Sequence, residues 1–197
     1  MSQAAEDAVL IRQCQTGDRS AFDSLVRQYE QKAFQYAYRL THDPDEAADV
    51  VSEAFVRVYN AIGNFRSQSS FGTWLYRILT NCYLDQRKKD KSRFTTSLDT
   101  NFQVEGGEVE RQVADTSDGP VEEAERSARE GAIQSALDLM PDYQKSMLIM
   151  YHVENLSYEE IAEALDLPLG TVKSRLNRAR IALRDHLSTN MELFNVE

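Results

Sequence analysis

Apolar residues recur at intervals of three and four along much of the chain, which is the spacing of amphipathic helices. In the first half this pattern predicts one helix over residues 18–40 and a second over residues 43–62, each beginning at an aspartate that can cap it. A third helix should follow the capping residue Ser70, with an apolar stripe between residues 71 and 82. The first half is therefore predicted to be a bundle of helices.

The second of these helices has the strongest start signal. Asp43 stands at the cap, Pro44 at the first helical position, and Glu46 three residues after the cap, where it can reach back to it. The predicted buried stripe is Val51, Phe55, Val58 and Ile62. The opposite face carries Glu46, Asp49, Glu53 and Asn60 together with the aliphatic Val56. Such a face is either a docking surface or an ordinary solvated surface, and periodicity does not separate the two.

The outward face of the third helix combines bases with aromatic rings. Its residues are Arg77, Thr80, Leu84, Arg87, Lys88 and Lys91, with Trp74 and Asn81 at the border and Tyr76 and Tyr83 beside them. Because cations hold a nucleic-acid backbone while rings stack on unpaired bases, this face suits single-stranded nucleic acid. The alternative is that the rings belong to the core. Phe71 is assigned there, and Trp74 is left open.

The second half contains a predicted helix-turn-helix. Pro120 opens a helix that reaches Met140, and a shorter helix covers residues 142–152. A capping box at residues 157–160 starts the next helix, and a turn at residues 166–170 leads into a basic one. Its predicted outward residues are Thr171, Lys173, Ser174, Asn177 and Arg178. In a major groove these side chains would reach phosphates and base edges.

Composition divides the chain in two. Its 197 residues include 32 acids and 22 Lys and Arg, a net charge of −10, and seven of these net negatives fall in residues 97–123. That acidic segment contains Gly and Pro and lacks apolar periodicity, which predicts a flexible linker. Whether the linker is only a spacer or also inhibits the two basic surfaces by covering them is left open.

Several classes of protein are not indicated. The longest run without a charged residue, residues 67–76, is half of the roughly 20 residues that a membrane span needs, and no signal peptide is visible, so we expect a cytoplasmic protein without membrane insertion. The two Cys and three His lack metal-ligand spacing, and no phosphate-binding or nucleophile motif occurs. We therefore expect no metal, no cofactor and no catalytic residues.

Three long segments, in this order, resemble the extracytoplasmic-function group (group 4) of bacterial RNA polymerase sigma factors. DEAADVVSEAFVRVY (45–59) is similar to the polymerase-binding helix, and FRSQSSFGTWLYRILTNCYLDQRKK (65–89) to the segment that opens and reads the minus-ten element. ALDLMPDYQKSMLIMYHVENLSYEEIAEALDLPLGTVKSRLNRAR (136–180) resembles the domain that reads the minus-thirty-five element. Two positions depart from the family pattern: Ser52 stands where Gln is common, and Lys145 where Arg is usual.

The resemblance implies an all-α protein of two small helical domains, residues 1–95 (region 2) and 124–197 (region 4), joined by the linker 96–123. It implies a non-enzymatic, stress-response transcription initiation factor that binds core RNA polymerase and promoter DNA and is held by an anti-sigma factor. The implied polymerase-binding residues are Asp49, Ser52, Glu53 and Val56. The implied minus-ten residues are Arg66, Ser67, Ser69, Trp74, Arg77, Asn81, Arg87 and Lys88, with Asn81 and residues 66–70 holding a flipped base. The implied minus-thirty-five residues are Thr171, Lys173, Ser174, Asn177 and Arg178.

The main alternative is a ligand-responsive repressor in which a helical sensor domain precedes the helix-turn-helix. Such proteins usually dimerise to match paired half-sites. The chain shows no sustained heptad seam, and a repressor does not explain the basic and aromatic face of residues 74–91. A helical adaptor that binds only proteins would leave both basic patches without a role.

Overall fold

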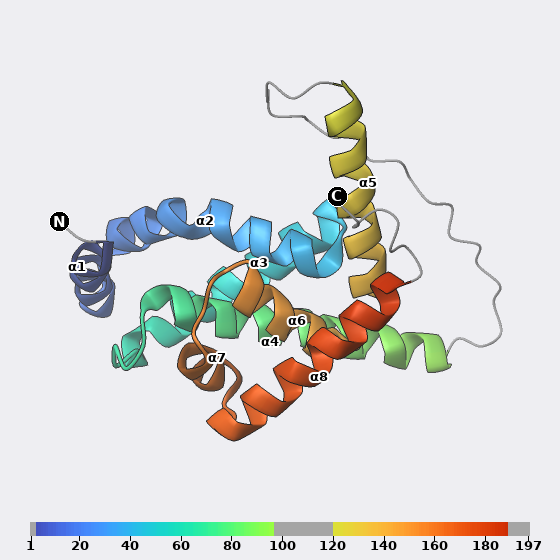
Figure 1. Ribbon diagram of the computed structural model, residues 1–197. Helices are drawn as coiled ribbons and strands as arrows, with labels where there is room; N and C mark the ends of the chain where they lie inside the picture. Colours follow the sequence, from blue (N-terminus) through green and yellow to red (C-terminus); the bar gives the residue numbers. More distant parts are fainter. Residues whose placement is uncertain (1–2, 97–119, 189–197) are drawn as a thin grey trace.

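The computed structural model describes residues 3–96 and 120–188, and all regular structure in these ranges is helical (Figure 1). The elements are α1 (Gln3–Gln15), α2 (Arg19–Thr41), α3 (Pro44–Ala61), the short 3-10 helix η1 (Ile62–Asn64), α4 (Phe71–Thr96), α5 (Pro120–Asp138), α6 (Asp142–His152), α7 (Tyr158–Leu165) and α8 (Leu169–Leu187). The predicted all-α class is confirmed. None of the helices in the described ranges has the length and apolar character to cross a bilayer.

Helices α2 to α4 form the core of the first half, as predicted. Asp18 caps α2 by accepting hydrogen bonds from the backbone N–H groups of Ser20 (2.8 Å) and Ala21 (3.3 Å). The sequence pattern predicts six core positions in this helix: Phe22, Leu25, Val26, Tyr29, Ala33 and Tyr36. Four of them are buried, whereas Phe22 and Val26 are only half-buried. Helix α1 was not predicted because its apolar stripe is thin. It is anchored by the buried side chain of Ile11 and by a polar contact, in which Tyr29 donates a 2.5 Å hydrogen bond to buried Asp7.

Helix α3 begins where its cap signal places it, but two details of the prediction were wrong. Asp43 accepts from the N–H groups of Asp45 (2.9 Å) and Glu46 (2.8 Å). Glu46 does not reach back to the cap: the Asp43 N–H donates to Thr41 Oγ1 (3.3 Å), and the Glu46 carboxylate lies 3.6 Å from Arg87. The buried stripe is also rotated by one residue, because α3 packs closely between α2 and α4 through small side chains. It consists of Ala47, Val50, Ala54 and Val58. Of the predicted positions, Val58 and Ile62 are buried, whereas Val51 and Phe55 are only half-buried.

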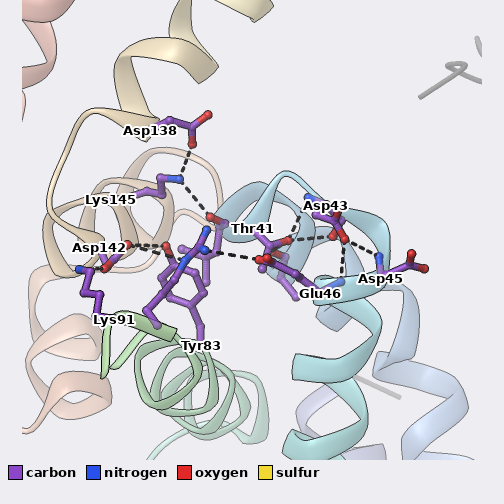
Figure 2. Close-up of polar contacts among 12 residues, drawn as sticks. Thr41, Asp43, Asp45, Glu46, Tyr83, Lys91, Asp138, Asp142 and Lys145 are labelled. Carbon is purple, nitrogen blue, oxygen red and sulfur yellow. Dashed lines mark hydrogen bonds and ion pairs between the residues drawn. The ribbon is translucent and has the colours of Figure 1, made fainter. Parts of the chain in front are cut away.

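Helix α4 starts at the predicted cap, where Ser70 Oγ accepts from the Thr73 N–H (3.0 Å). The prediction of its outward face is partly wrong. Thr80 is fully buried and shares a 2.7 Å hydrogen bond with Tyr36, and Tyr83 is 1% exposed. Thr80 is covered by Tyr36 of α2, and Tyr83 contacts Asp142 (Figure 2), a residue of the second half, whose position the pattern of α4 alone does not reveal.

The second half contains the predicted helix-turn-helix, α7 and α8. Ser157 and Glu160 form both bonds of a capping box, with Ser157 Oγ accepting from the Glu160 N–H (3.1 Å) and Glu160 accepting from the Ser157 N–H (2.9 Å). Asp166 ends α7 with a left-handed φ of 52°. Helix α8 begins two residues earlier than expected, since Pro168 precedes it. Of the predicted inward stripe, Val172, Leu176 and Ala179 are buried, whereas Leu183 is only half-buried.

The predicted linker, residues 96–123, lies largely outside the described residues. Its first residue closes α4 and its last four open α5.

The two halves pack against each other around α6, which lies in the middle of the molecule (Figure 1). Four consecutive residues, Met147 to Met150, are each at most 4% exposed. A helix that is buried on all sides needs neighbours on all sides. Helix α6 contacts α7 and α8 of its own half and α2 and α4 of the other, so one apolar core runs through both halves.

Candidate nucleic-acid and protein interfaces

The outward face of α3 presents all four residues that the sequence assigned to polymerase binding. Asp49, Ser52, Glu53 and Val56 are exposed, and Val56 is 56% exposed although it is aliphatic. Tyr59, one turn further on, is 49% exposed, and sequence reasoning did not single it out. Its ring packs edge-on against Phe22 (centroids 5.0 Å apart) and borders a hollow of about 250 Å³. The acidic and apolar groups therefore lie on one continuous side of α3.

Glu53 also has an internal partner. Arg57 donates to Glu53 (2.9 Å) and to Asp85 of α4 (3.0 Å). These two hydrogen bonds raise the pKa of the Arg57 guanidinium above its usual value. Arg57 thus joins α3 to α4, and Glu53 holds its guanidinium, whereas Asp49 and Val56 have no comparable contact among the described residues. The latter two are the cleaner test positions on this face.

The loop between η1 and α4 carries the first predicted minus-ten residues. Arg66 and Ser67 are exposed and Ser69 is half-buried, and Ser67 has a left-handed φ of 51°. The side chain of Gln15 holds the base of this loop by donating to the carbonyls of Ile62 (3.1 Å) and Phe65 (2.9 Å). Helix α1, which the sequence did not predict, therefore helps to position the loop.

Trp74, which the sequence left open, is half-buried. Its ring packs against Phe65 (4.7 Å between centroids) and Phe71 (5.8 Å). One side of the indole belongs to the aromatic cluster under the loop. The loop and the helix are therefore held together by the packing of these tilted rings.

The remaining minus-ten residues divide between two sides of α4. Trp74, Arg77, Asn81 and Lys88 follow one stripe at helical spacing, on which Asn81 and Lys88 are exposed. Arg87 lies on another stripe, with Thr73, Tyr76, Tyr83 and Lys91, that faces the second half of the chain. The predicted residues thus do not form one open surface in this arrangement.

Helix α8 presents the predicted minus-thirty-five set together. Lys173, Ser174, Asn177 and Arg178 are exposed and Thr171 is half-buried. Lys173 Nζ lies 6.0 Å from the ring centroid of Tyr158, and Ser174 donates to the Thr171 carbonyl (3.0 Å). The exposed ammonium, amide and guanidinium groups near the start of the helix can hydrogen-bond to base edges in the major groove.

Arg180, which belongs to the same basic run, has a structural role. Its guanidinium stacks on Tyr151 (4.5 Å) and donates to Tyr158 (3.3 Å) and to His152 (3.1 Å). Burial, together with the charge of Arg180, lowers the pKa of His152. Arg180 therefore joins α8 to α6 and α7. Elsewhere in the described residues, no three His, Cys, Asp or Glu side chains gather as metal ligands.

The described residues form a helical protein whose second half contains a helix-turn-helix, the motif with which many transcription proteins enter the major groove of DNA. Residues 25–93 match the family Sigma-70 region 2, and residues 130–183 match Sigma-70, region 4. The chain is 35% identical over 182 residues to the RNA polymerase sigma-H factor of Pseudomonas aeruginosa, covering 90% of this chain and 92% of that protein. It is 34% identical over 177 residues to the ECF RNA polymerase sigma factor SigW of Bacillus subtilis, covering 90% and 94%.

The chain therefore belongs to the extracytoplasmic-function RNA polymerase sigma factors. A sigma factor binds core RNA polymerase and directs it to promoters, which decides against the repressor and adaptor alternatives. Two solved structures share the fold. One is CnrH in complex with the cytosolic domain of CnrY (TM-score 0.64, 23% identical, covering 93% of this chain and 98% of that one). The other is the sigma factor RpoE in complex with the anti-sigma factor NepR from Bartonella quintana (TM-score 0.65, 23% identical, covering 85% and 96%).

Proposed function

We propose that this sigma factor works through three surfaces, each on a different helix. The outward face of α3 docks on core polymerase, the loop 66–70 and α4 open and read the minus-ten element, and α8 reads the minus-thirty-five element. Residues 1–95 and 124–197 are the corresponding functional units. The main support is that both sigma regions match this chain in the expected order. In addition, the exposed polar residues assigned to these roles lie on these helices.

The docking surface is the acidic and aliphatic side of α3. An exposed Val56 between carboxylates, with exposed Tyr59 beside it, suits a protein partner that offers bases around an apolar patch. Val56 and Tyr59 are exposed in the described part of the chain, so these groups are available for assembly.

Strand opening would rest on the loop and on the exposed stripe of α4. Taking one base out of the stack costs a few kcal/mol, which a preformed pocket and charged groups along the backbone can recover. Gln15 and the rings of Phe65 and Trp74 hold the loop before DNA arrives. We assign the displaced base to the space between residues 66–70 and Asn81.

Upstream recognition would rest on α8. Lys173, Ser174, Asn177 and Arg178 point away from the buried stripe of the helix, and the capping box holds α7 in place beside it. Arg178 and Asn177 carry the groups that pair bidentately with guanine and adenine.

We further propose an anti-sigma factor as a partner, as in the RpoE and NepR complex. Exposed Val56 and Ile181 (43% exposed) are apolar positions that it would cover. The protein acts on polymerase and DNA in the cytoplasm and has no catalytic activity of its own.

The docking assignment is tested by charge reversal on α3. Asp49→Lys should weaken binding to purified core polymerase at least tenfold while helicity stays unchanged. Glu30→Lys, a reversal at an exposed position of α2, is the matched control and should bind like the parent. Equal affinity of the two variants for core would contradict the assignment of α3.

A further inference from the structure

Helix α1 lies outside the part of the chain that matches Sigma-70 region 2, which begins at residue 25. It contacts η1, which directly precedes the segment 65–70 with the first proposed minus-ten residues. Helix α1 lies at the same end of the molecule as this loop (Figure 1). Two separate routes of contact connect the helix to the loop.

The first route is the side chain of Gln15, the last residue of α1. Its amide Nε2 donates to the carbonyl of Ile62 (3.1 Å) and to the carbonyl of Phe65 (2.9 Å), which are 47 and 50 residues further along the chain. The Phe65 N–H donates to the same Ile62 carbonyl (3.1 Å). One amide therefore holds both ends of η1 and fixes the direction in which the chain enters the loop.

The second route begins at Asp7, which is 6% exposed. Its carboxylate accepts from the Tyr29 hydroxyl of α2 (2.5 Å) and from the Gln28 amide (2.6 Å). The ring of Tyr29 packs edge-on against Phe71, the first residue of α4 (4.9 Å between centroids). Phe71 in turn contacts Phe65 (6.3 Å), so this route ends in the aromatic cluster under the loop.

The loop needs support from outside because its backbone is strained. Ser67 has a left-handed φ of 51°, which a residue with a side chain keeps only when its surroundings impose it. Residues 66–68 are exposed, so the loop is held mainly at its two ends. Gln15 holds the end at Phe65, and Tyr29 holds the end at Phe71.

We propose that α1 is part of the minus-ten reader, in which Gln15 and, through Tyr29, Asp7 are positioning residues that hold the loop 66–70 in the shape that receives the displaced base. This rests on the proposed function of the loop and of Asn81, and it adds the residues that set their base selectivity.

Preorganisation is the physical reason for this role. A pocket that is formed before the base arrives binds it without losing free energy in ordering the loop. Recognition of a base also requires contacts placed to within about 0.5 Å. Loosening the loop therefore lowers base capture, whereas docking through α3 and upstream reading through α8 stay as they are.

Gln15→Glu tests the first route. Glutamate has the same size as glutamine, but its carboxylate has no N–H group to donate to the two carbonyls. The probes are a single-stranded minus-ten oligonucleotide and the same strand with an abasic site, placed where loss of the base weakens binding by the parent holoenzyme most. The measured quantity is the ratio of the affinities for the intact and the abasic strand. We expect Gln15→Glu to lower this ratio at least about threefold.

The ratio separates positioning from stability and from charge. A partly unfolded protein, or one with an added negative charge, binds both strands more weakly by the same factor, so its ratio does not change. Gln13→Glu makes the same chemical change at an exposed position of α1 and should keep the ratio of the parent. Adding Gln15→Glu to Asn81→Ala should lower the ratio little further, because both changes act on the same base.

Tyr29→Phe tests the second route. It removes the hydroxyl that donates to Asp7 but keeps the ring against Phe71. The ratio should fall at least about twofold. Tyr38→Phe, at a half-buried position further along α2, is the matched control. Circular dichroism and the affinity for core polymerase should match the parent for all of these variants.

The role of α1 is overturned if Gln15→Glu keeps the same ratio as Gln13→Glu, whether or not both affinities fall. If only Tyr29→Phe matches its control, the route through Asp7 is wrong and the role of Gln15 remains. The proposed function is judged by the parent. If the parent binds intact and abasic strands equally at every minus-ten position, no displaced base is held and the function of the loop fails as well. If the parent distinguishes them and Gln15→Glu does so equally, only the role of α1 is wrong.

Discussion

Lys145 shows how one residue links the two halves of the molecule. Its ammonium joins the carbonyl of Leu40 in α2 to the carboxylate of Asp138 in α5, inside a nearly closed environment. A single ammonium suits a carbonyl and a carboxylate that approach from different helices, because its three donors are not held in a plane.

Replacing Lys145 by methionine tests this role. Lys145→Met keeps an apolar side chain of similar length but leaves the Leu40 carbonyl and Asp138 without the ammonium. The free energy of unfolding should fall by about 1–3 kcal/mol. Urea unfolding at pH 7 measures it, with Lys32→Met on the exposed side of α2 as the control. A loss below about 0.5 kcal/mol would mean that the contact contributes little.

The exposed site residues were predictable because their position on a helix determines their exposure. Asp49, Val56, Asn177 and Arg178 lie outward as the periodicity of α3 and α8 indicates. Thr80 and Tyr83 were misplaced, since their surroundings come from Tyr36 and from Asp142, which is about 60 residues further along the chain. Periodicity identifies a face, but it does not say what covers that face.

At the scale of the element, caps account for most of what the sequence predicted correctly. Asp18, Asp43, Ser70 and Ser157 all cap the helices assigned to them. Helix α1 was missed because its attachment rests on buried Asp7 and on the side chain of Gln15, which periodicity does not register. Helix α6 was predicted with the right bounds, but its burial on all sides was not.

The cap of α3 should contribute measurably to stability. Asp43→Ala removes the acceptor for the N–H groups of Asp45 and Glu46 and a favourable charge at the start of the helix. We expect a loss of about 1 kcal/mol in the free energy of unfolding, and Asp43→Asn or Asp43→Ser should recover most of it. Thermal unfolding of the three variants measures the difference. An alanine variant as stable as the parent would show that the cap is not needed.

At the scale of the whole molecule, Asp142 makes the packing of the two halves sensitive to acid. Burial raises the pKa of this carboxyl, but hydrogen bonds from Lys91 and Tyr83 and the charges of Lys91 and Arg87 outweigh it. The net pKa is below the ordinary value of 3.8. Because the folded pKa is lowered, the stabilisation is complete above that ordinary value and is lost as the pH falls through the folded pKa.

The stability difference between the parent and Asp142→Asn should therefore be constant from pH 8 to about pH 5 and shrink below about pH 4. Urea unfolding of both proteins across this range measures it. Tyr83, whose pKa burial raises to about 12, remains a neutral donor throughout. If the difference in unfolding free energy between the two proteins changes between pH 5 and 8, the titrating group is not Asp142.

The central claim is that this chain, added to core polymerase, starts transcription by opening promoter DNA through α4. The most direct measurement is run-off transcription with permanganate footprinting on a promoter that the factor recognises, comparing the parent with Asn81→Ala. The parent with core should yield a transcript and reactive thymines around the minus-ten element, and Asn81→Ala should bind the promoter but leave those thymines unreactive. If core polymerase with the parent opens no promoter, the proposed function of the chain is contradicted. If Asn81→Ala opens the promoter normally, the proposed role of α4 is contradicted.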